Sequence, residues 1–125
     1  MDNADIEEMF QSLGPVSIRR MFGGKGIYHH DVIFALYLFD EIMLKADIQT
    51  APEFAAAGAR QWVYQQPGKK PVAMPYWSVP ENAFDDPDEM ARWARLAYEA
   101  GVRAQKPETP KKSAKKRKND LGEGR

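Results

Sequence analysis

The chain has 125 residues, with 18 basic and 18 acidic side chains, no cysteine and 43% hydrophobic residues. This length predicts one small domain with a short extension, and such a domain can bury a core without disulfide or metal staples. The lack of cysteine excludes a disulfide scaffold and a thiolate zinc site. The longest apolar run, residues 32–39, is far shorter than the roughly 18 residues that cross a bilayer, and the acidic start does not have the form of a signal peptide. We therefore expect a cytoplasmic protein.

The zero net charge combines two segments of opposite sign. Residues 1–102 hold 9 basic and 15 acidic side chains, whereas residues 103–125 hold 9 basic and 3 acidic ones. From residue 106 onward few apolar side chains remain among prolines, glycines and lysines, so burial there cannot offset the entropy of ordering. We predict a globular domain over residues 1–106 and a disordered basic tail over residues 107–125.

The first predicted element is an amphipathic helix, because apolar residues recur at helical spacing: Ile6, Met9, Phe10 and Leu13. Asp2 or Asn3 can cap its start. Between residues 16 and 44 the pattern changes to strand-like runs, with breaks at residues 23–26 and 29–31. We expect three or four short antiparallel strands in this stretch.

The run 32–39 is apolar on both faces of a strand. One face would carry Val32, Phe34, Leu36 and Leu38, and the other Ile33, Ala35, Tyr37 and Phe39. Either this strand is central or one of its faces meets a partner. The next run, residues 42–47, alternates between apolar and polar positions, which favours a half-exposed strand at the flank of the sheet.

A capping box and a hairpin follow. Thr50 and Glu53 have capping-box spacing, which predicts a short helix with the threonine oxygen accepting an amide at its start. Residues 62–64 and 72–77 are typical of two paired strands, and Pro67-Gly68 between them suits a type II turn. Pro75 cannot donate to a sheet ladder, so it indicates an edge strand or a bulge.

The last predicted helix has a clear start, with Asp86 as cap and Pro87 in the first position. Its buried stripe is Met90, Trp93, Ala94 and Ala97, and it should run to about Gln105. The order α-β(3-4)-α-β(2)-α predicts an α/β domain of the α+β type. In this fold two layers are formed by an antiparallel sheet and the helices that cover it.

No constellation of catalytic residues is recognisable. The glycine cluster at 23–26 lacks the spacing of a phosphate-binding loop, which indicates a turn between strands. His29 and His30 are adjacent, so on a strand they point to opposite faces and do not share a metal easily. No serine lies in a nucleophile elbow. We therefore predict that the protein is not an enzyme, and that it has no catalytic residue, no cofactor and no metal site.

The basic tail is the candidate nucleic-acid contact. Six of the eight residues 111–118 are basic, namely Lys111, Lys112, Lys115, Lys116, Arg117 and Lys118. Six phosphate contacts correspond to a log-log salt slope of about minus five on duplex DNA, and such binding is not sequence-specific. The alternative is a solubilising tail that lies loosely against the acidic globule at low salt.

Two other groups are candidates for protein contacts. Trp62, Tyr64, Tyr76 and Trp77 lie on the predicted hairpin, where they either present an aromatic patch beside a free strand edge or belong to the core. Arg19 and Arg20 precede the glycine turn, where they either anchor an interface or form a solvated charge pair.

The run Arg19-Arg20-Met21-Phe22-Gly23-Gly24-Lys25-Gly26-Ile27-Tyr28, with residues 34–36 and 44–47 after it, resembles the TfoX N-terminal domain family of Sxy/TfoX competence regulators. Further matching segments extend the similarity over nearly all of residues 5–105. The resemblance implies a two-layer α/β domain with an antiparallel sheet. Full-length members add a helical C-terminal domain and are linked to DNA-uptake competence alongside the cyclic-AMP receptor protein at promoters.

The resemblance and the residues together give two main functional hypotheses, and a small enzyme or ligand-binding domain, which would require a polar pocket, is a third. The first is a non-enzymatic regulatory or protein-interaction module, with a protein partner in the transcription machinery and homodimerisation through a strand edge or the second sheet face. The second is a nucleic-acid-associated protein that binds through its basic tail. The resemblance implies no catalytic residues.

Overall fold

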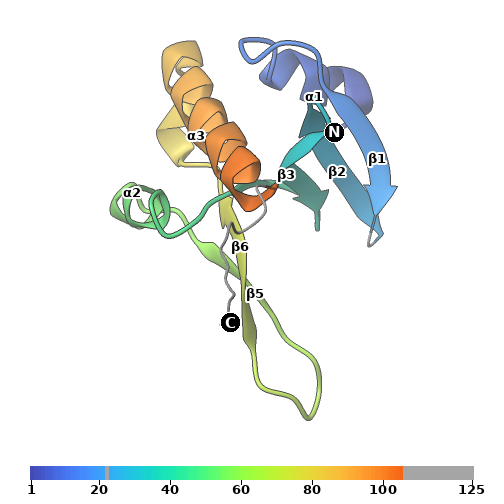
Figure 1. Ribbon diagram of the computed structural model, residues 1–125, viewed down its shortest axis with the longest axis vertical. Coiled ribbons are helices and arrows are strands. Elements are labelled where there is room, and N and C mark those ends of the chain that lie inside the picture. The colour runs from blue at the N-terminus through green and yellow to red at the C-terminus, as the bar shows by residue number, and fades with distance from the viewer. Residues whose placement is uncertain (22, 106–125) are drawn as a thin grey trace, which may run out of the picture.

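Six strands pair into one antiparallel sheet with the order β1-β2-β3-β4-β6-β5 in the computed structural model, which describes residues 1–21 and 23–105 (Figure 1). In chain order the elements are α1 (Asn3–Met9), β1 (Ser17–Met21), β2 (Gly24–His29), β3 (Val32–Leu38), β4 (Glu41–Lys45), α2 (Ala51–Ala56), β5 (Gln61–Tyr64), β6 (Val72–Ser78), the 3₁₀ turn η1 (Glu81–Ala83) and α3 (Pro87–Gln105). The predicted α+β class and element order are confirmed. The predicted tail, residues 107–125, lies outside the described residues.

The first and last helices begin with the predicted caps. The Asp2 carboxylate accepts a hydrogen bond from the Asp5 amide, and the Asp5 carboxylate accepts one from the Asp2 amide. At α3 the Asp86 carboxylate accepts from the Asp88 amide at 3.0 Å. These bonds satisfy amides that a helix start leaves unpaired. Helix α1 is shorter than predicted and ends at Met9 rather than near Leu13.

The predicted capping box at Thr50 is wrong. The Thr50 side chain makes no capping bond to α2, and its hydroxyl instead accepts a hydrogen bond from the Asp47 amide at 3.0 Å. The Asp47 carboxylate accepts from the Gln49 amide and, at 2.6 and 3.1 Å, from two guanidinium nitrogens of Arg103. This bidentate ion pair fastens the C-terminal end of α3 to the loop that follows β4.

The main core lies between the helices and one face of the sheet. It contains the predicted stripe of α3 and the inward side chains of the central strands, with Ile6, Phe10, Phe34, Leu44, Phe54 and Ala94 fully buried. Phe10 from α1 meets Phe34 of β3 edge to face, with ring centroids 5.0 Å apart. Apolar burial of this kind is the dominant stabilising term of a small domain.

The opposite face of the sheet carries a second apolar cluster, formed by Leu36, Leu38, Met43 and Tyr76. Two expectations fail here. Strand β3 does not keep one parity, because a bulge opposite Ile27 and Tyr28 places both Phe34 and Ala35 in the main core. Strand β4 is not at the flank but lies between β3 and β6, and Met43 packs into the second cluster. The alternation of β4 places Met43 on the face that was expected to be exposed, but side chains of the neighbouring strands cover it.

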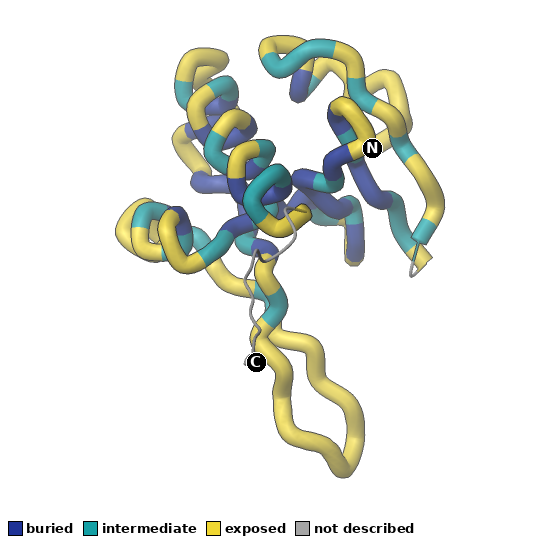
Figure 2. The backbone as a smooth tube through the Cα atoms, in the orientation of Figure 1, coloured by how far each residue is buried: buried dark blue, intermediate teal, exposed yellow. Residues whose placement is uncertain are grey.

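Strands β5 and β6 extend beyond the body as a two-stranded arm (Figures 1 and 2). The turn at the tip is closed by a hydrogen bond from the Lys69 amide to the Gln66 carbonyl, and Gly68 has a φ of +77°. This backbone suits the predicted type II turn, in which glycine supplies the positive φ. Pro75 is not in an edge strand, because β6 lies between β4 and β5, but it stands where β5 shifts register, as the bulge alternative predicted.

Within residues 1–21 and 23–105, no helix is both long enough and apolar enough to cross a membrane.

Candidate functional site

An apolar cleft of about 450 Å³ opens at the base of the arm. Five side chains line it: Leu38, Phe39, Trp62, Tyr64 and Met74. The Trp62 ring meets Phe39 and Tyr64 edge to face, with centroids 6.3 and 6.2 Å apart. We call this hollow the aromatic cleft. Its lining resembles the aromatic, methionine-containing centres of protein interfaces more than the polar lining of a catalytic pocket.

Phe39 is the most unusual residue of the cleft. Its side chain is 79% exposed, and its backbone has a φ of +54°. Asp40, the other central residue of this two-residue turn between β3 and β4, has a φ of +59°. Such a turn normally carries asparagine and glycine, which tolerate left-handed backbone, whereas a bulky aromatic residue there is strained. The fold thus holds an apolar side chain in solvent at a cost in backbone energy, which is a mark of functional sites.

The other walls of the aromatic cleft are held by local contacts. Trp62 is half-buried and packs against the second cluster, so its position is fixed by the sheet. Tyr64 is 44% exposed, and its hydroxyl accepts a hydrogen bond from the Gln66 side chain at 2.9 Å. At the base of the arm the Arg60 guanidinium pairs with Glu41 at 2.7 Å. The cleft is therefore formed on paired strands rather than on a free loop.

The other two aromatic candidates of the hairpin are core residues. Tyr76 is 7% exposed in the second cluster, with the Lys45 ammonium 4.8 Å from its ring centroid. Burial raises the pKa of Tyr76 to about 12, with a smaller contribution from Tyr28, and burial lowers the pKa of Lys45. Trp77 points to the other face and packs against Phe54. The four aromatic residues thus divide between a surface site and the core.

Arg19 and Arg20 lie away from the aromatic cleft, on β1. The Arg19 guanidinium lies 4.1 Å from the Tyr28 ring centroid and pairs with Asp31 at 3.0 Å. Arg20 is exposed and lines a shallow hollow around the glycine turn together with Lys25. The two arginines therefore do not join the aromatic hairpin in one site.

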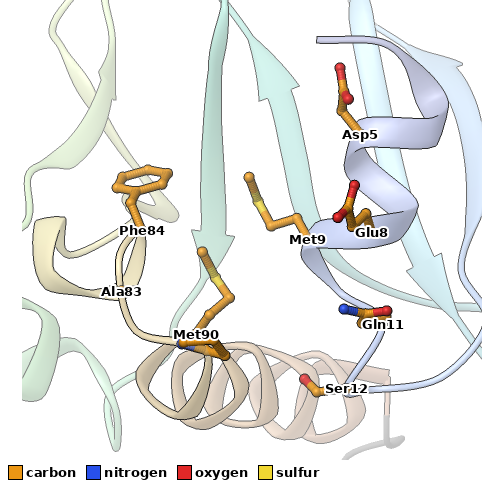
Figure 3. A pocket seen from close by; sticks show the side chains of 9 residues that line it. Asp5, Glu8, Met9, Gln11, Ser12, Ala83, Phe84 and Met90 are labelled. Carbon is orange, nitrogen blue, oxygen red and sulfur yellow. The ribbon is translucent and has the colours of Figure 1, made fainter.

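A second hollow lies between α1 and the start of α3, and Figure 3 shows its lining. Met9, Met90 and Phe84 form its apolar part, and Asp5 and Glu8 stand along the α1 side. The Asp5 carboxylate is already engaged in the cap of α1. This groove therefore offers apolar contact area beside one carboxylate that is already bonded.

Two further candidates from the sequence remain, His29 and the basic tail. His29 is buried, and its Nδ1 lies 2.7 Å from the Pro15 carbonyl oxygen, so the ring ties β2 to the segment before β1. The basic tail residues, Lys111, Lys112, Lys115, Lys116, Arg117 and Lys118, lie outside the described residues.

The sequence predicts Trp62 and Tyr64 as contact residues but gives no prediction for Leu38, Phe39 and Met74. Phe39 could have been found, because Phe39-Asp40 occupies a two-residue turn where asparagine and glycine are expected. Met74 gave no such signal, since its contact with the aromatic cleft depends on how the arm leaves the sheet.

A family model described as the TfoX N-terminal domain matches residues 8–101. The chain belongs to the TfoX N-terminal domain family. The match confirms the resemblance seen in the sequence and includes all six strands, so the aromatic cleft and the arm lie within the TfoX N-terminal domain itself. No curated protein sequence is detectably similar to the chain.

Proposed function

We propose that this TfoX N-terminal domain protein is a non-enzymatic regulatory module that binds a protein partner through the aromatic cleft. The observation that carries the proposal is Phe39, an aromatic side chain 79% exposed on strained backbone at the mouth of an apolar hollow. Solvent exposure of such a group brings no stability, whereas burial of aromatic side chains contributes strongly to protein association.

The occupant that fits the aromatic cleft is an apolar side chain of another protein. A volume of about 450 Å³ accommodates one or two large side chains, and the edges of Trp62 and Tyr64 offer aromatic contacts to them. Among the described residues β5 is an edge strand of the sheet, so an extended segment can pair with it while one side chain enters the cleft. A second copy of the chain is the competing occupant, and light scattering distinguishes it from a different protein.

The regulatory part of the proposal rests on family membership and on the absence of a recognisable catalytic constellation in the sequence. The resemblance to Sxy/TfoX regulators favours a partner in the transcription machinery and a cytoplasmic location.

The test compares capture of partners by three full-length proteins from a nuclease-treated native lysate. Phe39→Asn and Tyr64→Ser alter the aromatic cleft, and Arg95→Ala, on the exposed side of α3, is the matched control. We expect one retained protein to be lost with both cleft variants and kept with the control. Equal retention by all three proteins would contradict the proposal. Light scattering at tens of micromolar tests for self-association. If the unaltered protein is a dimer and both cleft variants are monomers, a second copy of the chain is the occupant.

The basic tail supports a second candidate function, which is non-specific nucleic-acid binding. Six basic residues within residues 111–118 can neutralise about six phosphates. Replacing these six by glutamine in the full chain should reduce the magnitude of the log-log salt slope on duplex DNA by about five. An unchanged slope would refute a contact through the tail.

A further inference from the structure

The outer part of the arm, residues 63–73, leaves the body of the protein as a short ribbon that is closed by a loop (Figures 1 and 2). In the ribbon Val63 pairs with Ala73 and Tyr64 pairs with Val72, and residues 65–71 form the loop. Every residue in this range is exposed. The ribbon contributes no side chain to either apolar cluster. Stability of the fold therefore does not account for its length or its composition.

The arm is the basic pole of an acidic domain. The arm, residues 61–78, contains two basic side chains, Lys69 and Lys70, and no aspartate or glutamate. The rest of residues 1–105 contains 15 acidic and 8 basic side chains. Arg60 pairs with Glu41 at the base of the arm, so the positive charge of the outer arm comes from Lys69 and Lys70 beside the tip.

The arm also separates these lysines from the acidic body. Lys70 lies six positions along the chain from the buried Tyr76, which corresponds to at most about 20 Å of extended chain. Charges in solution are screened over about 8 Å at physiological ionic strength. A polyanion at the tip is therefore attracted by the two lysines and is only weakly repelled by the carboxylates of the body.

We infer that the outer arm is a duplex nucleic-acid contact, with Lys69 and Lys70 on the phosphates. Both lysines lie in the exposed loop that closes the arm, and lysine is a common phosphate contact in protein–DNA interfaces. Gln65 and Gln66 lie in the same loop, where their side-chain nitrogens donate to the Lys69 carbonyl and to the Tyr64 hydroxyl, so they order the loop beside the two lysines. The contact is independent of the aromatic cleft at the base of the arm.

A nucleic acid fits the arm better than an acidic protein does. Residues 111–118 of the same chain include six basic side chains, and two basic segments in one sequence suit a long polyanion. Two lysines alone give weak binding, and the second basic element raises their effective concentration at the duplex. Binding through the arm is therefore measured most clearly as a change in salt slope.

The experiment measures fluorescence anisotropy of a labelled 20-base-pair duplex with full-length protein at several salt concentrations. The arm variant is Lys69→Gln with Lys70→Gln, and the control is Arg92→Gln with Arg95→Gln, which removes the same charge from α3. Loss of two phosphate contacts lowers the magnitude of the log-log slope by about 1.8 and weakens binding at 0.1 M salt by at least about tenfold. The control should leave the slope of the unaltered protein unchanged. The arm lysines are exposed, so urea unfolding should give the same midpoint for the arm variant as for the unaltered protein.

The result that overturns the proposal is an equal slope for the arm variant and the control. A slope change seen with a 20-nucleotide single strand but not with the duplex would also overturn it. The arm variant is also tested in capture from lysate. If it loses a protein that the unaltered protein retains, while its slope on the duplex is unchanged, the arm contacts an acidic protein instead. Phe39→Asn should keep the full slope, so failure of the arm proposal and failure of the cleft proposal are distinguishable.

Discussion

Replacing Phe39 by asparagine should remove partner binding while leaving the fold as stable as before. Asparagine accepts left-handed backbone readily, so the substitution releases about 1 kcal/mol of strain. Phe39 is 79% exposed, so only about a fifth of its roughly 200 Å² is buried, which is worth about 1 kcal/mol. The two terms offset each other, and we expect the free energy of unfolding to change by less than about 0.5 kcal/mol.

Urea unfolding followed by tryptophan fluorescence measures this balance, with partner capture measured on the same preparations. Asp40→Gly is the matched control, because it relaxes the same turn and leaves the lining of the aromatic cleft intact. Truncation of a buried phenylalanine such as Phe34 typically costs 3–5 kcal/mol. A loss above about 1.5 kcal/mol in Phe39→Asn would show that Phe39 is held in place for packing, and the argument from strain would be refuted.

Three further predictions concern stability. Asp47→Ala should lower the unfolding free energy by about 2 kcal/mol, because it removes the bidentate pair with Arg103 and the turn bonds. The Arg103 side chain and the turn amides lower the pKa of Asp47 in the folded state below its usual 3.8. The stability that Asp47 contributes is therefore present above about pH 4 and is lost as the pH falls through the folded-state pKa. Acid unfolding of the unaltered protein and of the variant measures this loss. Gly101→Ala should destabilise by about 2 kcal/mol despite a better helix propensity, because an added Cβ would lie 2.5 Å from the Ile33 carbonyl oxygen; an unchanged melting temperature would contradict this close packing. Burial raises the pKa of Tyr76 to about 12 in the folded state, whereas the pKa in the unfolded chain is about 10. About 2 to 3 kcal/mol of stability is therefore present below pH 10 and is lost between pH 10 and 12. Alkaline unfolding curves of Tyr76→Phe should lack this loss.

The sequence was most informative where short-range rules decide the structure. The caps at Asp2 and Asp86, the type II turn at Pro67-Gly68 and the buried stripe of α3 all follow from spacing and residue type. Each depends on neighbours within a few residues along the chain, so a single sequence contains the necessary information.

Features that depend on distant segments were not predictable in this way. The alternation of β4 indicated a flank, but pairing with β6 covers Met43 and makes the strand central. Thr50 has capping-box spacing, yet its hydroxyl accepts from the Asp47 amide in the loop that Arg103, 56 positions further along the chain, holds by an ion pair. The site was found in part for the same reason, since Trp62 and Tyr64 signal themselves by residue type whereas Leu38 and Met74 join them only through the sheet.

The most direct test of the central claim is photo-crosslinking from inside the aromatic cleft. A photoreactive phenylalanine analogue is placed at position 39, at position 64 or, as a control, at position 95 on α3, and the full-length proteins are irradiated in native lysate. We expect positions 39 and 64 to crosslink to the same protein and position 95 to give no such crosslink. Crosslinks of equal yield from all three positions, or from position 95 alone, would contradict the assignment of the aromatic cleft as the docking surface.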